Sequence, residues 1–543
     1  MSRLSRRTVL KAGIAAGTTL ALARPAIVRA DDRPSITVAV QQIANSNTLE
    51  PLREQSNVGY RIAPLYLESL IEQDLQRELQ EIPGLATEWR RIDDRTVELT
   101  LRQGVRFHNG DEMTAEDVAF TFGPERMFGK GTGGDQRLFT STVGGDTKEL
   151  PPEVPAVARR FWPSLDRVEI VDSRTVRFVN KVPDVTLEGR IGRLAGQIVS
   201  RRGFSEARTW IDWARRPIGT GPYRVGELRP DVSLTFEAFD DYWGGRPPIR
   251  QIRFIVVPEV ASRINGLFSG QYDFACDIPP DQVPEITKNA RFDVAGGLVP
   301  NHRLTCFDKT HPELRDPRVR RAFTHAIDRQ LIVESLWGGR TRVPRGLQWE
   351  FFGQMFVEDW EVPKYDPAEA KRLLREAGYK GGVIPYRLLN NYYPNQTATG
   401  QILTEMWRQV GLNVEIQMKE NFSQVYDRNS QRGVRDWSNS ALYNDPLSSL
   451  VNQHGPKGQQ QQVGEWTNEE MNRLAVELET STDRAKRKAM FRRMLEICER
   501  EDPAYTVLHQ TAIFTGKRKD IQWKAAPAFA MDFRAHNFRI GRG

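Results

Sequence analysis

The residues best suited to binding chemistry lie at 437–446, in the sequence WSNSALYNDP. Trp437 and Asn439 are two residues apart, so they face the same side of the chain if this stretch forms a strand. An aromatic face beside an amide suits a neutral polar ligand, such as a sugar or a modified amino-acid conjugate. The competing interpretation is that Trp437 is a core residue, and the sequence leaves both open.

The sequence gives little support to a catalytic function. It contains no H-E-x-x-H, G-x-S-x-G or G-x-x-x-x-G-K-[ST] motif. Its seven histidines are scattered without the spacing of metal ligands. We therefore expect no catalytic residue, no metal and no cofactor, and we keep an exported hydrolase only as the alternative from another class.

The glycines at 129, 131 and 134 satisfy a G-x-G-x-x-G pattern, but a predicted strand does not precede them and a capped helix does not follow. A nucleotide site is therefore not expected there. Because residues 123–160 also contain a proline cluster, we predict a long surface loop over this range.

The first thirty residues are typical of an export signal. The sequence SRRTVLK at 5–11 matches the twin-arginine pattern, a run of small apolar residues follows at 12–23, and Val28-Arg29-Ala30 fits a cleavage site. The alternative, a short membrane anchor, needs a longer apolar run than this segment provides. We expect an exported periplasmic protein that is cleaved after about Ala30.

Removal of this leader changes the charge of the chain. Six of the 77 basic residues lie in the leader, so the remaining 71 are balanced by 70 acidic residues. The positive net charge of the whole chain therefore does not indicate a nucleic-acid partner, and the balanced surface is that of a globular protein.

The chain is too long for a single core and predicts two or three lobes. Its three cysteines, Cys276, Cys306 and Cys498, allow at most one disulfide in an oxidising compartment. A Cys276–Cys306 bridge and buried free thiols both remain open.

The stretch 83–122 contains the clearest local signals. Residues 96–101 alternate apolar and polar side chains, as a half-buried strand does, and 105–108 resume that pattern. Asn109-Gly110-Asp111 is a predicted turn. Thr114 is placed to cap a helix, with Asp117 at the third helical position to complete a capping box.

This stretch also resembles the signature of the peptide/nickel class of extracellular solute-binding proteins, known as family 5. The matching motifs are P-x-L-A-x-x-W at 83–89, L-R-x-G-V-x-F-H-x-G at 101–110 and T-A-E-D-V at 114–118. Further matches lie at 217–223 (PIGTGPY) and 316–323 (DPRVRRAF). The residues from Asp316 to Gly338 also read as one amphipathic helix, which Asp316 caps and Gly338 ends.

The resemblance implies an α/β fold of the periplasmic-binding-protein type (type II, cluster C-like). Two α/β lobes joined by a hinge are expected, with an extra inserted lobe. We expect lobe I at 31–66, 214–300 and 505–543, the inserted lobe at 67–213 and lobe II at 301–504. Two strands at 506–508 and 512–515 are predicted to return the chain to lobe I.

The resemblance also implies a function. Family members serve as the substrate-binding component of an ABC importer, so the expected partners are a small solute and the ABC permease subunits of the inner membrane. The expected ligand is a peptide or peptide-like solute, and the expected state is a monomer. The alternative ligand is an oligosaccharide, an opine-like conjugate or a metal chelate.

The same resemblance points to site residues. Glu50-Pro51 occupies the place of a family Asp-Pro dipeptide, and the residues that follow it often contact ligand, which nominates Gln55 and Asn57. Family members usually carry G-W-x-x-D-Y-x-D-P near 437–446, and peptide binders pair its first Asp with the ligand's α-amino group. Aligned on Asp445-Pro446, that Asp maps to Leu442 and the Trp maps to Asn439. Because Leu442 offers no carboxylate, a ligand held by a free amino terminus is less expected here.

Overall fold

The computed structural model describes residues 31–77, 79–129, 150–193, 195–390, 392–428 and 431–541. The leader and most of the glycine run, on which the export and loop predictions rest, lie outside these residues. Residues 34–543 form one compact unit. Within the described ranges, no helix combines the length and apolar composition needed to cross a bilayer.

One mixed sheet of ten strands dominates the described part of the chain. In spatial order its strands are β14 (Val414–Lys419), β13 (Ile384–Leu389), β15 (Val434–Ser440), β12 (Phe292–Phe307), β16 (Tyr505–Arg518), β11 (Phe274–Ala275), β1 (Ser35–Val40), β10 (Gln251–Val256), β9 (Ser233–Ala238) and β8 (Tyr223–Arg229).

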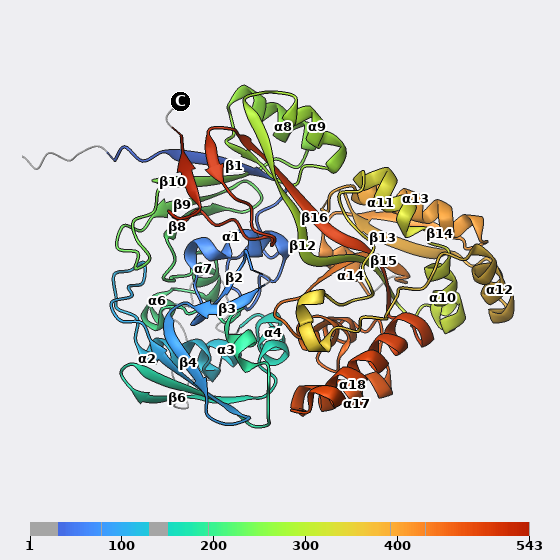
Figure 1. Ribbon diagram of the computed structural model, residues 1–543, viewed down its shortest axis with the longest axis horizontal. Coiled ribbons are helices and arrows are strands. Elements are labelled where there is room, and N and C mark those ends of the chain that lie inside the picture. Colours follow the sequence, from blue (N-terminus) through green and yellow to red (C-terminus); the bar gives the residue numbers. More distant parts are fainter. Residues whose placement is uncertain are drawn as a thin grey trace, which may run out of the picture. The chain divides into compact units, whose positions relative to one another are not determined.

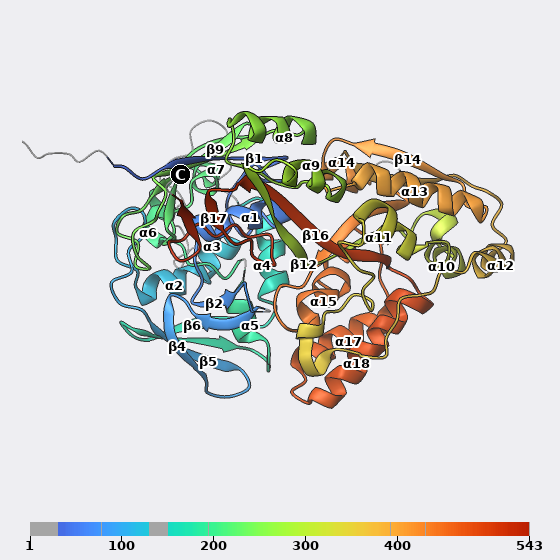
Figure 2. The ribbon, with the colours of Figure 1, turned by 45° about the horizontal axis from the view of Figure 1, so that its top comes forward.

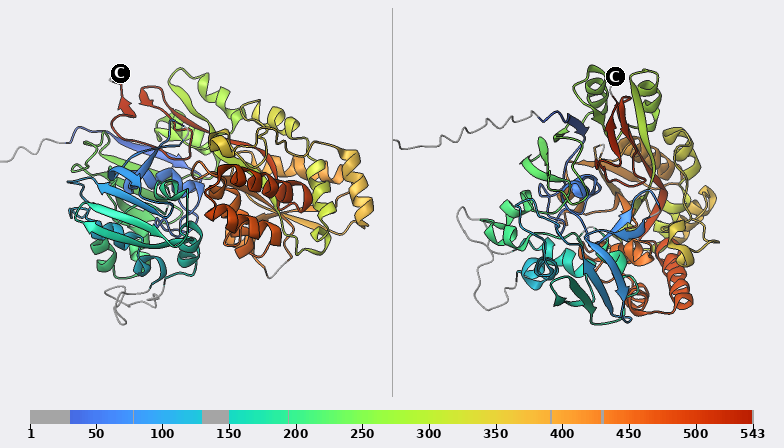
Figure 3. Two further views of the ribbon diagram at one scale, coloured as in Figure 1. Left: turned by 60° about the horizontal axis from the view of Figure 1, so that its bottom comes forward. Right: turned by 60° about the vertical axis from the view of Figure 1, so that its left-hand side comes forward.

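The long antiparallel strands β12 and β16 are the connection between the two ends of this sheet. The first half of β12 pairs with residues 512–518 of β16, and β11 joins that end of β16. The second half of β12 pairs with β15, β15 pairs with β13, and β13 pairs with β14. In Figures 1 and 2 the blue-to-green and the yellow-to-orange parts of the chain lie on either side of this pair. The same division is visible from two other sides in Figure 3.

The register between β12 and β16 is interrupted where the chain passes from one part to the other. Leu298 pairs with Ala512 and His302 pairs with Gln510, so three residues of β12 are opposed by one residue of β16. Such a bulge bends the strand and interrupts its hydrogen-bond ladder. Pro300 lies inside it.

Three smaller sheets complete the strands of the described residues. One has the order β4 (Ala86–Arg91), β5 (Thr96–Leu101), β7 (Thr175–Asn180) and β6 (Leu165–Asp172), and the other two are β2 (Ile71–Asp74) with β3 (Gln80–Pro83) and β17 (Ile521–Trp523) with β18 (Phe538–Ile540). The predicted strand at 96–101 is therefore correct, whereas 105–108 contributes only a single bridge, between Arg106 and Glu112.

Helices pack on these sheets along the whole chain. In the first part they are α1 (Asn57–Tyr66), α2 (Ala115–Thr121), α3 (Pro124–Phe128), α4 (Glu153–Phe161), α5 (Leu187–Ile191), α6 (Arg201–Glu206), α7 (Trp210–Arg215), α8 (Val260–Ser269) and α9 (Val283–Thr287). In the second part they are α10 (Pro317–His325), α11 (Arg329–Trp337), α12 (Pro367–Ala377), α13 (Gln396–Gln409), α14 (Phe422–Tyr426), α15 (Leu450–His454), α16 (Gln459–Gln462), α17 (Glu469–Thr480) and α18 (Arg484–Glu496). Five short helical turns add η1 (Pro280–Gln282), η2 (Pro312–Leu314), η3 (Glu350–Met355), η4 (Pro446–Ser448) and η5 (Ile497–Glu501).

Helix α2 begins as predicted. The backbone N–H and the hydroxyl of Thr114 donate to Asp117 Oδ2 at 3.0 and 2.9 Å, and the capping box is complete. Asp117 Oδ1 also accepts from the backbone N–H of Arg201, 84 residues further on. A local capping signal therefore also fixes a long-range contact.

The predicted single helix from Asp316 to Gly338 is wrong: two helices, α10 and α11, occupy this range. Asp328 has extended backbone angles and caps α11 by accepting from Leu331 N at 2.9 Å. The buried guanidinium of Arg329 donates back to carbonyls at the end of α10, including Thr324 O. Asp328 thus starts a new helix in the middle of the apolar pattern, because an Asp with extended backbone angles favours a helix N-terminus.

Two further predictions need correction. The loop expected at 123–160 contains α3 and α4 in its described parts, because the apolar residues Val154, Val157, Ala158 and Phe161 bury one face of α4. The two strands expected at 506–508 and 512–515 are a single strand, β16. The polar residues between them do not end it, since Gln510 Nε2 donates to Val299 O at 3.0 Å and Thr511 Oγ1 donates to Asn301 Oδ1 at the bulge.

All three cysteines are buried free thiols, so the structure decides against the Cys276–Cys306 bridge. Burial raises the pKa of Cys276 to about 11 and that of Cys306 to about 12. These side chains pack as small apolar groups.

Candidate binding cleft

A cavity of about 360 Å³ lies where the bulge of β12 faces α1, α4 and β15. Its lining is drawn from segments that are hundreds of residues apart in the chain, and Pro300 of the bulge contributes to it. Eight of its lining side chains are aromatic: Tyr60, Phe161, Tyr392, Tyr393, Phe422, Tyr426, Trp437 and Phe529. We call this the main cavity. An apolar, aromatic wall with a few polar groups is the usual composition of a small-molecule site.

The residues before α1 and its first turn form one wall of the main cavity, and this wall includes Gln55 and Asn57, the first residue of the helix. Asn57 Nδ2 donates to Ser438 Oγ at 3.4 Å and so links α1 to β15. Glu54 is 4% exposed and accepts hydrogen bonds from the backbone N–H and the hydroxyl of both Ser46 and Ser56. Four internal donors therefore satisfy this carboxylate.

Strand β15 forms the opposite wall. Trp437 lines the cavity and packs edge-to-face on Phe422 and Tyr426, with ring centroids 5.4 and 5.7 Å apart. Ser438 and Ser440 also line it, and both hydroxyls accept from Asn301 Nδ2, at 3.1 and 2.8 Å. The bulge of β12 thus holds the serines of β15 in place.

The two residues that depart from the family pattern have different surroundings. Leu442 is half-buried and lines the main cavity. Asn439 is 2% exposed, is not among the lining residues and donates from Nδ2 to Ser449 O at 3.4 Å. Gln55, Asn57, Trp437 and Leu442 are therefore brought together, whereas Asn439 is covered by the chain that follows β15.

A buried ion pair supports the floor of the site. Arg303 of β12 donates to both oxygens of Asp436, at 2.5 and 2.6 Å, and its guanidinium lies 3.5 Å from the ring centroid of Tyr393. Gln396 Nε2 donates to the same carboxylate at 2.5 Å. Separating Arg303 from Asp436 would leave a buried charge without a partner, so the ion pair is expected to hold Arg303 in place. Arg303 in turn fixes the position of the Tyr393 ring that it contacts.

Two arginines of the segment 67–213 also reach the main cavity: Arg160 of α4 and Arg193, which follows α5. Burial lowers the pKa of Arg160 to about 10, and the interaction with Tyr426 opposes this effect. Arg193 is 6% exposed and donates from Nη1 to Tyr60 Oη and Gln73 Oε1, both at 2.8 Å.

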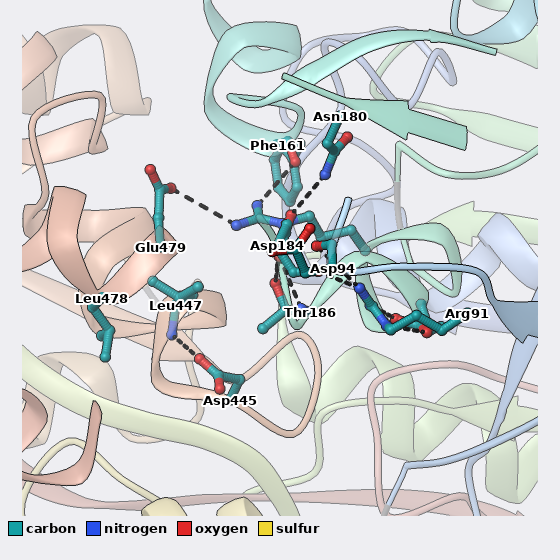
Figure 4. A network of polar contacts seen from close by, with 12 residues as sticks. Arg91, Asp94, Phe161, Asn180, Asp184, Thr186, Asp445, Leu447, Leu478 and Glu479 are labelled. Carbon is teal, nitrogen blue, oxygen red and sulfur yellow. Dashed lines mark hydrogen bonds and ion pairs between the residues drawn. The ribbon is translucent and has the colours of Figure 1, made fainter. Parts of the chain in front are cut away.

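A second cavity, of about 250 Å³, adjoins the main cavity and shares Arg160, Phe161, Leu442 and Asn452 with it. Arg190 of α5 and Glu479 of α17 lie on its two sides, and their charged groups approach to 3.7 Å. Figure 4 shows Asp184 and Phe161 on one side of this region and Leu478 and Glu479 on the other. Gln73 Nε2 makes a further link between the sides by donating to Leu442 O at 3.2 Å.

Potential metal-ligating side chains of the described residues are not gathered into a metal site. No group of three or more His, Cys, Asp or Glu side chains among them is placed to hold a metal ion. Burial lowers the pKa of His454 and that of His509 to about 3, which makes both neutral packing residues at physiological pH.

Sequence reasoning missed several lining residues. Arg160 ends the range predicted as a loop and Phe161 follows it, although the apolar spacing of α4 is a signal that favours a helix. Tyr392 and Tyr393 lie where the family match is weak, and their adjacent aromatic rings are the one signal that marks them. Arg193 has no local signal.

These features define a solute-binding protein of the periplasmic-binding-protein type, and comparison with known proteins gives the family. The family model of bacterial extracellular solute-binding proteins, family 5 (middle region), matches residues 80–461. The chain belongs to this family, whose members are transport binding proteins and not enzymes.

Individual relatives are distant but cover most of the chain. The dipeptide-binding protein of Escherichia coli is 24% identical over 472 residues, which is 81% of this chain and 83% of the relative. The crystal structure of a dipeptide-binding protein from Pseudoalteromonas sp. SM9913 with Met-Leu superposes with a TM-score of 0.77 at 21% identity, over 93% of this chain and 100% of that one. A periplasmic binding protein from Helicobacter pylori with the peptide STSA gives a TM-score of 0.79 at 17% identity, over 94% and 99%. These structures confirm the type II α/β fold predicted from the sequence.

Proposed function

We propose that this protein is the periplasmic substrate-binding component of an ABC importer and that it captures a peptide or peptide-like solute. The observation that carries the proposal is the main cavity, whose walls come from both sides of the β12–β16 connection. A solute bound there contacts both sides at once, so it favours the form in which they are close together. The peptide ligands named for the relatives support the solute class.

The proposed mechanism is hinge closure. Only two strands of the main sheet join its two ends, and their register is broken at Pro300. We propose lobe I at 31–66, 214–300 and 505–543, the inserted lobe at 67–213 and lobe II at 301–504. The closed form is then the one recognised by the permease subunits, while ATP hydrolysis belongs to other proteins of the importer.

The proposed ligand contacts are Gln55, Asn57, Trp437 and Leu442. Each of them lines the main cavity, and Asn57 and Trp437 come from opposite walls. Asn439 does not line it, so we leave this residue out of the proposed contacts.

The proposed route to the periplasm is twin-arginine export with cleavage after about Ala30, and the proposed state is a monomer. Fractionation of cells that express the full chain, with and without an Arg6→Lys/Arg7→Lys double change, tests the route. Retention of the double variant in the cytoplasm is the expected result, and unchanged export contradicts it.

Binding is tested with purified protein lacking residues 1–30. Isothermal titration and thermal shift with di- and tripeptides should show saturable binding, since a ligand stabilises the state that it binds. Small-angle scattering should show a smaller radius of gyration at saturation. Binding without compaction contradicts hinge closure, and binding of an oligosaccharide, an opine-like conjugate or a metal chelate in place of every peptide contradicts the peptide assignment.

A further inference from the structure

Arg160 is a half-buried cation that forms no ion pair within the described residues. Its side chain lines both cavities, and its Nε is buried without a hydrogen-bond partner among the described residues. Its guanidinium lies 5.2 Å from the ring centroid of Phe161. A desolvated guanidinium gains strongly from an oxyanion, because its fork of N–H donors matches a carboxylate.

Other buried arginines of this chain are satisfied from within. Arg435 donates to Glu465 at 2.8 Å, and Arg126 donates to Glu50 at 2.5 Å. Arg329 has no carboxylate partner, but its guanidinium donates to backbone carbonyls such as Val507 O at 2.7 Å. Arg160 therefore differs from these three arginines, because it has no such partner among the described residues.

Arg193 is a second uncompensated cation on the same cavity. Its partners Tyr60 and Gln73 are neutral, and its buried Nε has no partner among the described residues. Its guanidinium lies 4.7 Å from the ring centroid of Tyr60, which holds the side chain in place. One buried and one half-buried guanidinium group thus line one cavity without a carboxylate partner in the described residues.

Within the described residues, the acids that line the main cavity form no ion pair with these two arginines. The oxygens of Glu54 are occupied by Ser46 and Ser56, and Glu153 makes no ion pair within the described residues. Leu442, which lines both cavities with Arg160, stands where the family pattern has an acid. An aspartate there would place a negative charge on the same cavity walls as Arg160.

We infer that Arg160 and Arg193 form an anion-binding subsite and that the transported solute is recognised through a carboxylate placed against the segment 67–213. The inference rests on the proposed function and narrows it to carboxylate-bearing solutes, with a free α-amino group not required. The carboxylate is either the C-terminus of a peptide or an acidic side chain.

Four probes separate these sources: Ala-Leu, Ala-Leu amide, N-acetyl-Ala-Leu and Ala-Glu amide, each titrated calorimetrically. We expect Ala-Leu and its N-acetyl form to bind at least tenfold more tightly than Ala-Leu amide. Tighter binding of Ala-Glu amide than of Ala-Leu amide assigns the subsite to an acidic side chain as well. Equal affinity for Ala-Leu and its amide, without such a gain, overturns the inference.

Variants test whether Arg160 is responsible for the preference for a carboxylate over an amide. Arg160→Gln should reduce the acid-to-amide affinity ratio to within about twofold, whereas Arg160→Lys should keep part of it. Arg159→Gln is the matched control, because Arg159 is the exposed neighbour on α4 and lies over Phe128 instead. A ratio that survives Arg160→Gln, or that falls equally in Arg159→Gln, overturns the assignment.

The inference and the proposed function can fail separately. A protein that binds none of the four probes contradicts the peptide function, and the subsite is then tested by thermal shift with succinate and with its uncharged diamide. Stabilisation by succinate alone, lost in Arg160→Gln, supports the anion subsite without peptides. No stabilisation by succinate in that case overturns it.

Discussion

Arg190 and Glu479 face each other across the second cavity, with Nη2 of the arginine 3.7 Å from Oε1 of the glutamate. Arg190 is held on its own side by Asp184, whose Oδ2 accepts from Nε at 2.9 Å. The position of the cation therefore does not depend on Glu479 alone. Gly189, next to Arg190, packs closely against Tyr443. A Cβ at position 189 would lie 2.9 Å from Tyr443 Cβ.

Glu479→Gln should weaken closure without unfolding either side. The lost ion pair is partly exposed and is expected to contribute about 0.5–1 kcal/mol. The dissociation constant of a bound solute should therefore rise about two- to fivefold, mostly through faster dissociation. Glu477→Gln is the control, because Glu477 lies on the same helix and pairs with Lys486 instead. Equal effects of both variants would contradict a role of Glu479 in closure.

Glu72 should make stability depend on pH in the neutral range. Burial, with a further contribution from Glu68, raises its pKa from 4.5 to about 7. Below pH 4.5 the carboxyl is protonated in both the folded and the unfolded chain, so it has no effect. As pH rises from 4.5 to 7 the unfolded chain loses this proton first, and the free energy of unfolding falls by at most about 3 kcal/mol.

The melting temperature of Glu72→Gln should therefore exceed that of the unchanged protein by an amount that increases from pH 5 to pH 8. Thermal melts over this range measure the difference. Glu169→Gln, at a partly exposed glutamate of β6, serves as control and should leave the pH profile unchanged. Parallel profiles for Glu72→Gln and the unchanged protein would show that Glu72 is not the group responsible.

The three cysteines should react only after unfolding. They are buried and free, and burial raises the pKa of each thiol, so thiolate is scarce in the native protein. Ellman's reagent should detect no thiol in native protein and three in denaturant without reductant. One thiol in denaturant would indicate a disulfide.

Trp437 and Asn439 should respond differently to mutation. Trp437→Ala removes aromatic contact area from the main cavity and should lower solute affinity by about tenfold. Asn439→Ser acts away from the cavity and should change the melting temperature by a few degrees with affinity preserved. Titration and thermal melts of both variants test this, and a loss of affinity in Asn439→Ser would return that residue to the site.

The sequence by itself determined the elements whose signals are adjacent in the chain. The capping box of Thr114 and Asp117 and the left-handed Gly338 at the end of α11 were predicted because both act within one helical turn. The family followed in the same way, since its motifs are short and contiguous. One long helix was predicted where there are two, because the periodicity of the apolar residues continues across the Asp328 cap.

The tertiary structure alone decided which side chains meet at the site. Trp437 and Asn439 have the same strand parity, yet Asn439 is covered because Ser449 folds back over it. The contact of Gln73 with the Leu442 carbonyl joins residues 369 positions apart. The surroundings of Arg160 are likewise set by distant parts of the chain. No local pattern predicts whether a carboxylate lies beside it, because desolvation and charge compensation depend on the whole fold.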